Sequence, residues 1–344
     1  MPWEQGAESI EVVASVNDRN AVEAAKDERM NSGDIHDEMA AMREGAATSR
    51  AVAAMPEAAQ AQYETVLNAA KESGIPDADA AVQQMARTGR FQRNPELLPA
   101  LNQLATQKPA PRLAEQDPNV NNRLVGELAR QLTNPATIQQ DPGFDTCAQA
   151  AMEQQFAAQQ PAQYAQFIAD MASADKYAQT AGGANIGLPI YGLEGSEGST
   201  RSLASAMYQQ GMNAAFNQAN AEDSLTTDAL QAMVKSQFPN QEVVTFGQDQ
   251  AWAATGQLKE GTIAIVETGE GVKHAVNVTA SRDGEITYND PQGRQVTTSA
   301  AEFQKVLVGA VLPQDSGIRS THENFGIGEG AGTVLTSGRV GGRR

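Results

Sequence analysis

The chain contains a single cysteine, Cys147, at the predicted start of a helix. Thr146 and Gln149 have the Thr-x-x-Gln spacing of a capping box, which places Cys147 in the first helical turn. The helix dipole and the free backbone N–H groups at this position favour a thiolate over a thiol. Because Asp145 opposes that effect, a cationic partner is needed. The alternative interpretation is a buried structural cysteine.

His274 is the histidine best placed to be that partner. His36 lies in a polar helical segment and His322 in a glycine-rich tail, whereas His274 lies in a predicted strand. Alternation along this strand puts its side chain on the same face as Val276 and Val278, so it is expected to point inward. The alternative interpretation is a core histidine with satisfied hydrogen bonds.

The next strand supplies a carboxylate, and the register of the hairpin can be derived. A three-residue loop at 282–284, with its glycine in the left-handed region, pairs Val278 with Tyr288 and Val276 with Asp290. This pairing keeps the apolar side chains of both strands on one face, which favours it over other registers.

In this register Asp290 lies diagonally beside His274, within reach of the imidazole. A two-residue turn of Asp283 and Gly284 would shift the strand by one residue and bring Asn289 to that position instead. The shift would also divide the apolar side chains between the two faces. Asp290 is therefore the predicted orienting residue, and Asn289 is the alternative.

Two glutamines precede the cysteine and could contribute to an oxyanion hole. The side-chain amide of Gln140 or Gln139 could donate to an oxyanion together with the backbone N–H of Cys147. In a chain rich in alanine and glutamine, two adjacent glutamines can also arise from composition alone.

Helix-forming residues dominate the first 110 or so positions, and strand-forming residues appear only after Gln241. Helices are predicted at 19–31, 34–54, 56–73, 77–88, 95–105, 120–133, 147–158, 161–179, 202–218 and 225–237. Strands are predicted at 243–246, 262–266, 272–280, 286–289, 295–298 and 306–311. A glycine-rich loop is predicted at 182–200.

Helices followed by antiparallel strands are typical of the α+β class. Residues 106–118 contain three prolines and are interpreted as a linker. We expect an all-helical N-terminal domain at 16–110, which could bind a partner protein, and a second domain at 118–313. Residues 1–15 and the glycine-rich tail at 314–344 could be disordered.

The net charge of −17 over 344 residues argues against binding to nucleic acids or anionic membranes. The N-terminus lacks the features of a signal peptide, and no apolar run is long enough to span a membrane. The expected location is the cytoplasm, or outside the cell by export without a cleaved signal peptide.

No cofactor or metal site is predicted. One cysteine and three widely separated histidines provide no metal-ligand cluster, and the glycine-rich stretches lack the lysine and preceding strand of a phosphate-binding loop.

The ordered set Cys147, His274 and Asp290 resembles the papain-like cysteine peptidase superfamily over residues ~139–312. KHAV at 273–276 and YNDPQG at 288–293 carry the resemblance, nearest to the bacterial bacteriocin-processing and secreted-effector branches.

The resemblance implies a helical subdomain packed on an antiparallel sheet, and hydrolysis of a protein or peptide substrate through a Cys-His-Asp triad without a cofactor. The same groups would also serve a deamidase, a transglutaminase or another acyltransferase. A binding or structural protein that keeps the fold without catalysis is the alternative. The glutamine of papain relatives usually stands one position closer to the cysteine than Gln140 does.

Overall fold

The computed structural model describes residues 39–141, 143–217, 225–268 and 271–327. Contacts divide the chain into two units, Met1–Ala54 and Met55–Arg344. In the first unit, residues 39–53 form a helix, as predicted, and residues 34–38 of the predicted helix lie outside the described residues. The predictions for 1–15, 19–31 and 328–344 lie outside the described residues.

The second unit begins with a series of helices, most of which follow the predicted ranges closely, whereas the short helices at 90–93 and 111–116 were not predicted. They are α2 (Glu57–Glu72), α3 (Ala78–Arg87), α4 (Arg90–Arg93), α5 (Leu97–Thr106), α6 (Pro111–Gln116), α7 (Val120–Thr133), α8 (Cys147–Gln159), α9 (Pro161–Ala172), α10 (Leu203–Phe216) and α11 (Thr227–Gln237). The spacing of α7 explains its packing, since Val120, Leu124, Leu128 and Leu132 recur every four residues and are buried. Among the described helices, none is long and apolar enough to cross a bilayer.

The helix predicted at 161–179 is shorter than expected. It ends at Ala172, because the backbone of Ser173 is extended and does not continue the helix. The chain then forms a small hairpin of β1 (Ala178–Gln179) and β2 (Asn185–Ile186). Residues 187–200, within the predicted glycine-rich loop, contain neither helix nor strand.

The segment 106–118 lies inside the second unit, so the contacts place the division of the chain elsewhere than the sequence suggested. Helix α5 packs against α9, and α2 and α3 pack against α7. Leu104 and Leu113 are buried, and the Ala110 N–H donates to the Ala172 carbonyl at 2.7 Å. A proline of the segment begins α6, a position where its missing N–H costs nothing.

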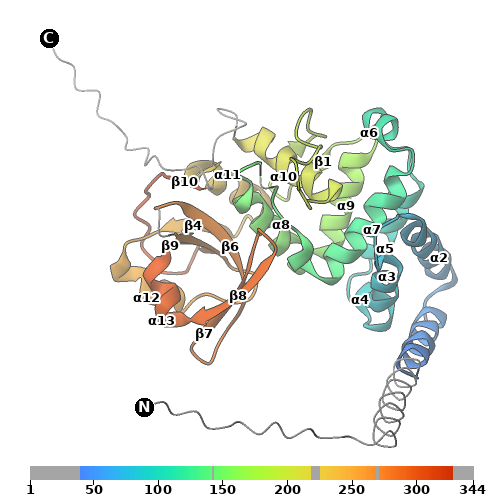
Figure 1. The fold of residues 1–344 in the computed structure, drawn as a ribbon, viewed down its shortest axis with the longest axis horizontal. Helices are drawn as coiled ribbons and strands as arrows, with labels where there is room; N and C mark the ends of the chain where they lie inside the picture. The colour runs from blue at the N-terminus through green and yellow to red at the C-terminus, as the bar shows by residue number, and fades with distance from the viewer. Residues whose placement is uncertain (1–38, 142, 218–224, 269–270, 328–344) are drawn as a thin grey trace, which may run out of the picture. The chain divides into compact units, whose positions relative to one another are not determined.

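The sheet confirms the α+β class. Its strands are β4 (Gln241–Thr245), β5 (Ile263–Glu267), β6 (Lys273–Arg282), β7 (Glu285–Asp290), β8 (Arg294–Ser299) and β9 (Leu307–Pro313). They are antiparallel in the order β4-β9-β5-β6-β7-β8. Two helices that were not predicted, α12 (Gln248–Thr255) and α13 (Ala300–Val306), complete this part of the unit (Figure 1).

Both faces of β6 are covered. Val276 and Val278 belong to a core that includes residues of α12 and α13. The side chain of Asn277 instead donates to the Ala151 carbonyl of α8 at 3.3 Å. Successive strand residues point to opposite faces, so α8 packs on the face opposite α12 and α13. The strand is therefore buried on two sides rather than on the single face that alternation suggested.

The turn of the β6–β7 hairpin differs from the prediction. Arg282 pairs with Glu285, so Asp283 and Gly284 alone form the turn, and the predicted three-residue loop is wrong. Both residues have positive φ, 55° and 78°, which is the geometry of a type I′ turn.

A β-bulge between Val278 and Ala280 offsets the shift that this shorter turn introduces. Beyond the bulge Val278 pairs with Tyr288, as predicted, and Asn277 pairs with Asn289. The register near the start of β6 is consequently the one that the apolar pattern required, although the turn is not.

Part of the expected disordered tail is ordered. Within 314–327, Phe325 and Ile327 are buried, and β10 (Gly326–Ile327) pairs with β3 (Leu225–Thr226). The burial of two large apolar side chains offsets the entropy cost of ordering this segment.

The shared helical core predicts that a fragment of residues 118–327 is much less stable than one of residues 55–327. Removing α2 to α6 exposes the faces of α7 and α9 that these helices cover, and each large side chain uncovered costs about 1.5–3 kcal/mol. Urea denaturation of the two fragments measures the difference. Equal unfolding midpoints and equal cooperativity would show that the helices form an independent domain.

Candidate active site

Cys147 is the first residue of α8, as predicted, but the expected capping box does not form. The Thr146 hydroxyl donates to Gln209 at 2.9 Å, and Gln149 donates to Asn213 at 3.1 Å. The cysteine is buried, with 1% of its surface exposed. Its backbone N–H lies in the first turn, where no intrahelical acceptor is available.

His274, the second residue of β6, lies between the cysteine and a carboxylate. Its Nε2 is 3.1 Å from Oδ1 of Asp290 at the end of β7. Because Asp290 takes Nε2, the other ring nitrogen, Nδ1, is left for the thiol. The Cys147 side chain lies close enough to this imidazole to raise its pKa. The structure thus brings together all three residues that the sequence singled out.

The electrostatics of the site favour an imidazolium. Burial lowers the pKa of His274, but hydrogen bonds to Asp290 and Cys147, together with their charges, outweigh burial and raise it to about 10. Burial also raises the pKa of Asp290. Hydrogen bonds from His274, the Gln292 N–H and Arg294 counter this, and the net effect lowers the pKa below its usual value.

Asn289, the alternative orienting residue, is not at the histidine. It pairs with Asn277 across the hairpin, and its amide oxygen accepts from Gln295 at 3.3 Å. Because neighbouring residues of a strand point to opposite faces, Asn289 and Asp290 are separated by the sheet.

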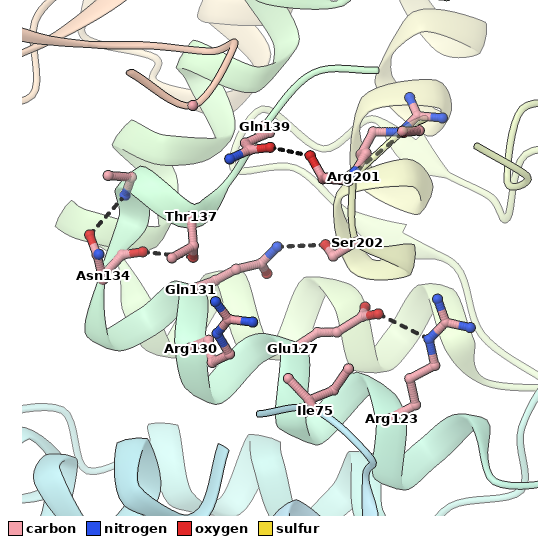
Figure 2. Close-up of a pocket in the computed structure, with 14 residues that line it drawn as sticks. Ile75, Arg123, Glu127, Arg130, Gln131, Asn134, Thr137, Gln139, Arg201 and Ser202 are labelled. Carbon is pink, nitrogen blue, oxygen red and sulfur yellow. Dashed lines mark hydrogen bonds and ion pairs between the residues drawn. The ribbon is translucent and has the colours of Figure 1, made fainter. Parts of the chain in front are cut away.

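The two glutamines before the cysteine have different surroundings. The Gln139 side chain accepts a hydrogen bond from the Thr200 hydroxyl and lines a pocket of about 580 Å³ (Figure 2). Gln140 is buried, and its N–H donates to the Pro291 carbonyl at 2.8 Å, next to Asp290. Among the described residues its side-chain oxygen has no hydrogen-bond partner. Gln140 is the better oxyanion candidate because its backbone is tied next to Asp290, whereas Gln139 lines the other pocket.

A second pocket, of about 510 Å³, adjoins the histidine. His274 and Asp290 line it together with apolar groups that include Val272 and Tyr288, and with Arg294. Cys147 is not among its lining residues. The pocket therefore reaches the site from the side of the histidine.

Sequence reasoning missed a buried polar network behind the cysteine, centred on Glu153. This residue of α8 is completely buried and accepts hydrogen bonds from Tyr164 (2.6 Å), Ser205 (2.9 Å) and Gln209 (2.9 Å). Glu153 is the one charged residue of the alanine- and glutamine-rich α8, and this isolated charge was the feature of the sequence that could have indicated a buried polar network. Nothing in the sequence indicated its partners.

The described part of the chain contains no cluster of three or more His, Cys, Asp or Glu side chains suited to a metal ion. The sequence matches no protein-family model, and a comparison with curated proteins finds no match either.

Burial makes Glu153 a source of pH-dependent stability. Burial raises its pKa from 4.5 to about 7, since hydrogen bonds from Tyr164, Gln209 and Ser205 and the charge of Arg201 offset only part of the effect. The folded protein then binds more protons than the unfolded chain between these values. The contribution is complete below the unfolded pKa and is lost as the pH rises through about 7.

We therefore predict that the free energy of unfolding of the wild type, relative to Glu153→Gln, falls by about 3 kcal/mol between pH 4 and 8. Urea denaturation across this range measures the difference. The matched control is Glu302→Gln at an exposed position. Its free energy of unfolding should change with pH in the same way as that of the wild type. A wild type that also runs parallel to Glu153→Gln would mean that Glu153 titrates normally.

Proposed function

We propose that the second unit is a papain-like cysteine hydrolase that cleaves a peptide bond in a protein or peptide substrate. The observation that carries the proposal is the position of His274, which is hydrogen-bonded to Asp290 and interacts with the single cysteine. The chain order of Cys147, His274 and Asp290, and the packing of α8 on β6, support the same class.

In this mechanism His274 holds the thiol proton, and the resulting imidazolium stabilises the Cys147 thiolate. Asp290 keeps the imidazole oriented, with Nδ1 toward the sulfur. The thiolate attacks the substrate carbonyl, and the Cys147 N–H and Gln140 side chain stabilise the oxyanion. His274 then protonates the departing amine, and water hydrolyses the thioester.

One observation favours a second candidate, a binding protein that keeps the fold without catalysis. Cys147 has only 1% of its surface exposed, so a large substrate must displace part of its cover before attack. Small electrophiles need much less displacement, and they separate a reactive cysteine from an inert one.

The first test is alkylation by iodoacetamide at about pH 6, where an ordinary thiol is almost entirely protonated. The wild type should react, and His274→Ala should react at least about tenfold more slowly because the thiolate loses its counter-charge. Mass spectrometry of the intact protein measures both rates, with Cys147→Ser as the blank. Equal rates would mean that His274 does not activate the thiol.

The second test compares two neighbouring residues of similar burial, Asp290 (7% exposed) and Asn289 (6%). Asp290→Ala should lower the turnover of p-nitrophenyl acetate by about 10- to 10⁴-fold, because the imidazole loses its orienting partner. Asn289→Ala should change turnover much less. The opposite ranking would contradict the assignment of Asp290.

A further inference from the structure

The segment that carries Gln140 is held at three consecutive residues by α8, by α10 and by the turn after β7. Gln154 of α8 donates to the Ile138 carbonyl at 2.9 Å, and Gln209 of α10 donates to the Gln139 carbonyl at 3.0 Å. The Gln140 N–H donates to the Pro291 carbonyl at 2.8 Å. These bonds fix the backbone of 138–140, and with it the origin of the Gln140 side chain.

Gln209 makes a further contact on the other side of the site. Its Oε1 accepts from the hydroxyl of Thr146 at 2.9 Å, and Thr146 directly precedes Cys147. One carboxamide therefore links the backbone beside Gln140 to the residue before the nucleophile. These are the two places from which the proposed oxyanion donors extend.

Glu153 determines which way that carboxamide faces. Its Oε2 accepts from Nε2 of Gln209 at 2.9 Å, while Oε1 is occupied by Tyr164 and Ser205. A flipped Gln209 would direct its oxygen at the Gln139 carbonyl, which is an acceptor at any pH, and at Glu153, which repels it when ionised, so the flipped orientation is disfavoured. The buried Glu153 thus favours one orientation of Gln209.

We propose that Gln209, oriented by Glu153, is a positioning residue that sets the separation of the two oxyanion donors, the Cys147 N–H and the Gln140 side chain. The inference rests on the proposed function and deepens it. Gln209 itself does not touch the reacting atoms. It acts through the backbone at Gln139 and through Thr146.

Two reagents separate this role from activation of the thiol. Iodoacetamide is displaced at a saturated carbon, so its transition state has no oxyanion. With p-nitrophenyl acetate, the thiolate adds to the carbonyl carbon, the oxyanion collapses with loss of p-nitrophenolate, and water then releases acetate from the thioester. Only the second reaction needs the oxyanion donors.

The variants are Gln209→Met, which keeps the size of the side chain, and the double variant Glu153→Gln/Gln209→Glu. In the double variant the amide at position 153 donates a hydrogen bond to the carboxylate at position 209, so donor and acceptor are exchanged relative to the wild type. The carboxylate that it introduces at position 209 cannot donate to the Gln139 carbonyl. The double variant therefore carries the test even if Gln209→Met does not fold.

Gln155→Met is the control. Gln155 is a buried carboxamide of the same helix, α8, and its partners, Gln159 and Gln241, lie outside the proposed site.

Both Gln209 variants should keep an iodoacetamide rate within about threefold of the wild type and should acetylate about 100-fold more slowly, the loss typical of a displacement near 1 Å. Gln155→Met should match the wild type in both reactions. The inference is overturned if the folded Gln209 variants acetylate at the wild-type rate, or if both of their rates fall equally. A wild type and His274→Ala that react identically with iodoacetamide would instead refute the proposed function.

Discussion

The packing of α8 on β6 is the contact on which the site depends. Helix α8 begins with Cys147, and strand β6 contains His274. A hydrogen bond from the Asn277 side chain to the Ala151 carbonyl joins the two elements one helical turn beyond the cysteine. A helix start supplies unpaired N–H groups, and a strand holds its side chains at fixed spacing. The chemistry proposed for the site requires both features at once.

A network of buried polar groups, centred on Glu153, lies behind Cys147. A buried carboxylate is costly unless it is hydrogen-bonded, and Glu153 meets that condition through three donors from α9 and α10. An apolar side chain there would avoid the cost but would remove one of the two acceptors that orient the Gln209 amide. The network therefore stabilises one geometry of the segment before Cys147, at some expense in the free energy of folding.

The sequence identified the three candidate site residues better than it identified the residues that support them. The apolar pattern was sufficient for α7 and for placing Asp290 rather than Asn289 beside His274, because the register near the start of β6 keeps the apolar residues on one face. It could not reveal the bulge that reconciles an Asp-Gly turn with that register, since bulges leave no periodic signal. Thr146 and Gln149 have the spacing of a capping box, yet tertiary partners on α10 take both side chains. The proline-rich segment does not coincide with the division between the two units, because Leu104 and Leu113 are buried and α5 packs against α2 and α9.

The central claim is that His274 maintains Cys147 as a thiolate at neutral pH. Because the chain has one cysteine, the ultraviolet absorbance of a thiolate reports on this residue alone. At about pH 7 the wild type should show this absorbance, Cys147→Ser should lack it, and His274→Ala should lose most of it. Absorbance that appears in wild type and His274→Ala together, and only above about pH 8, would contradict the claim.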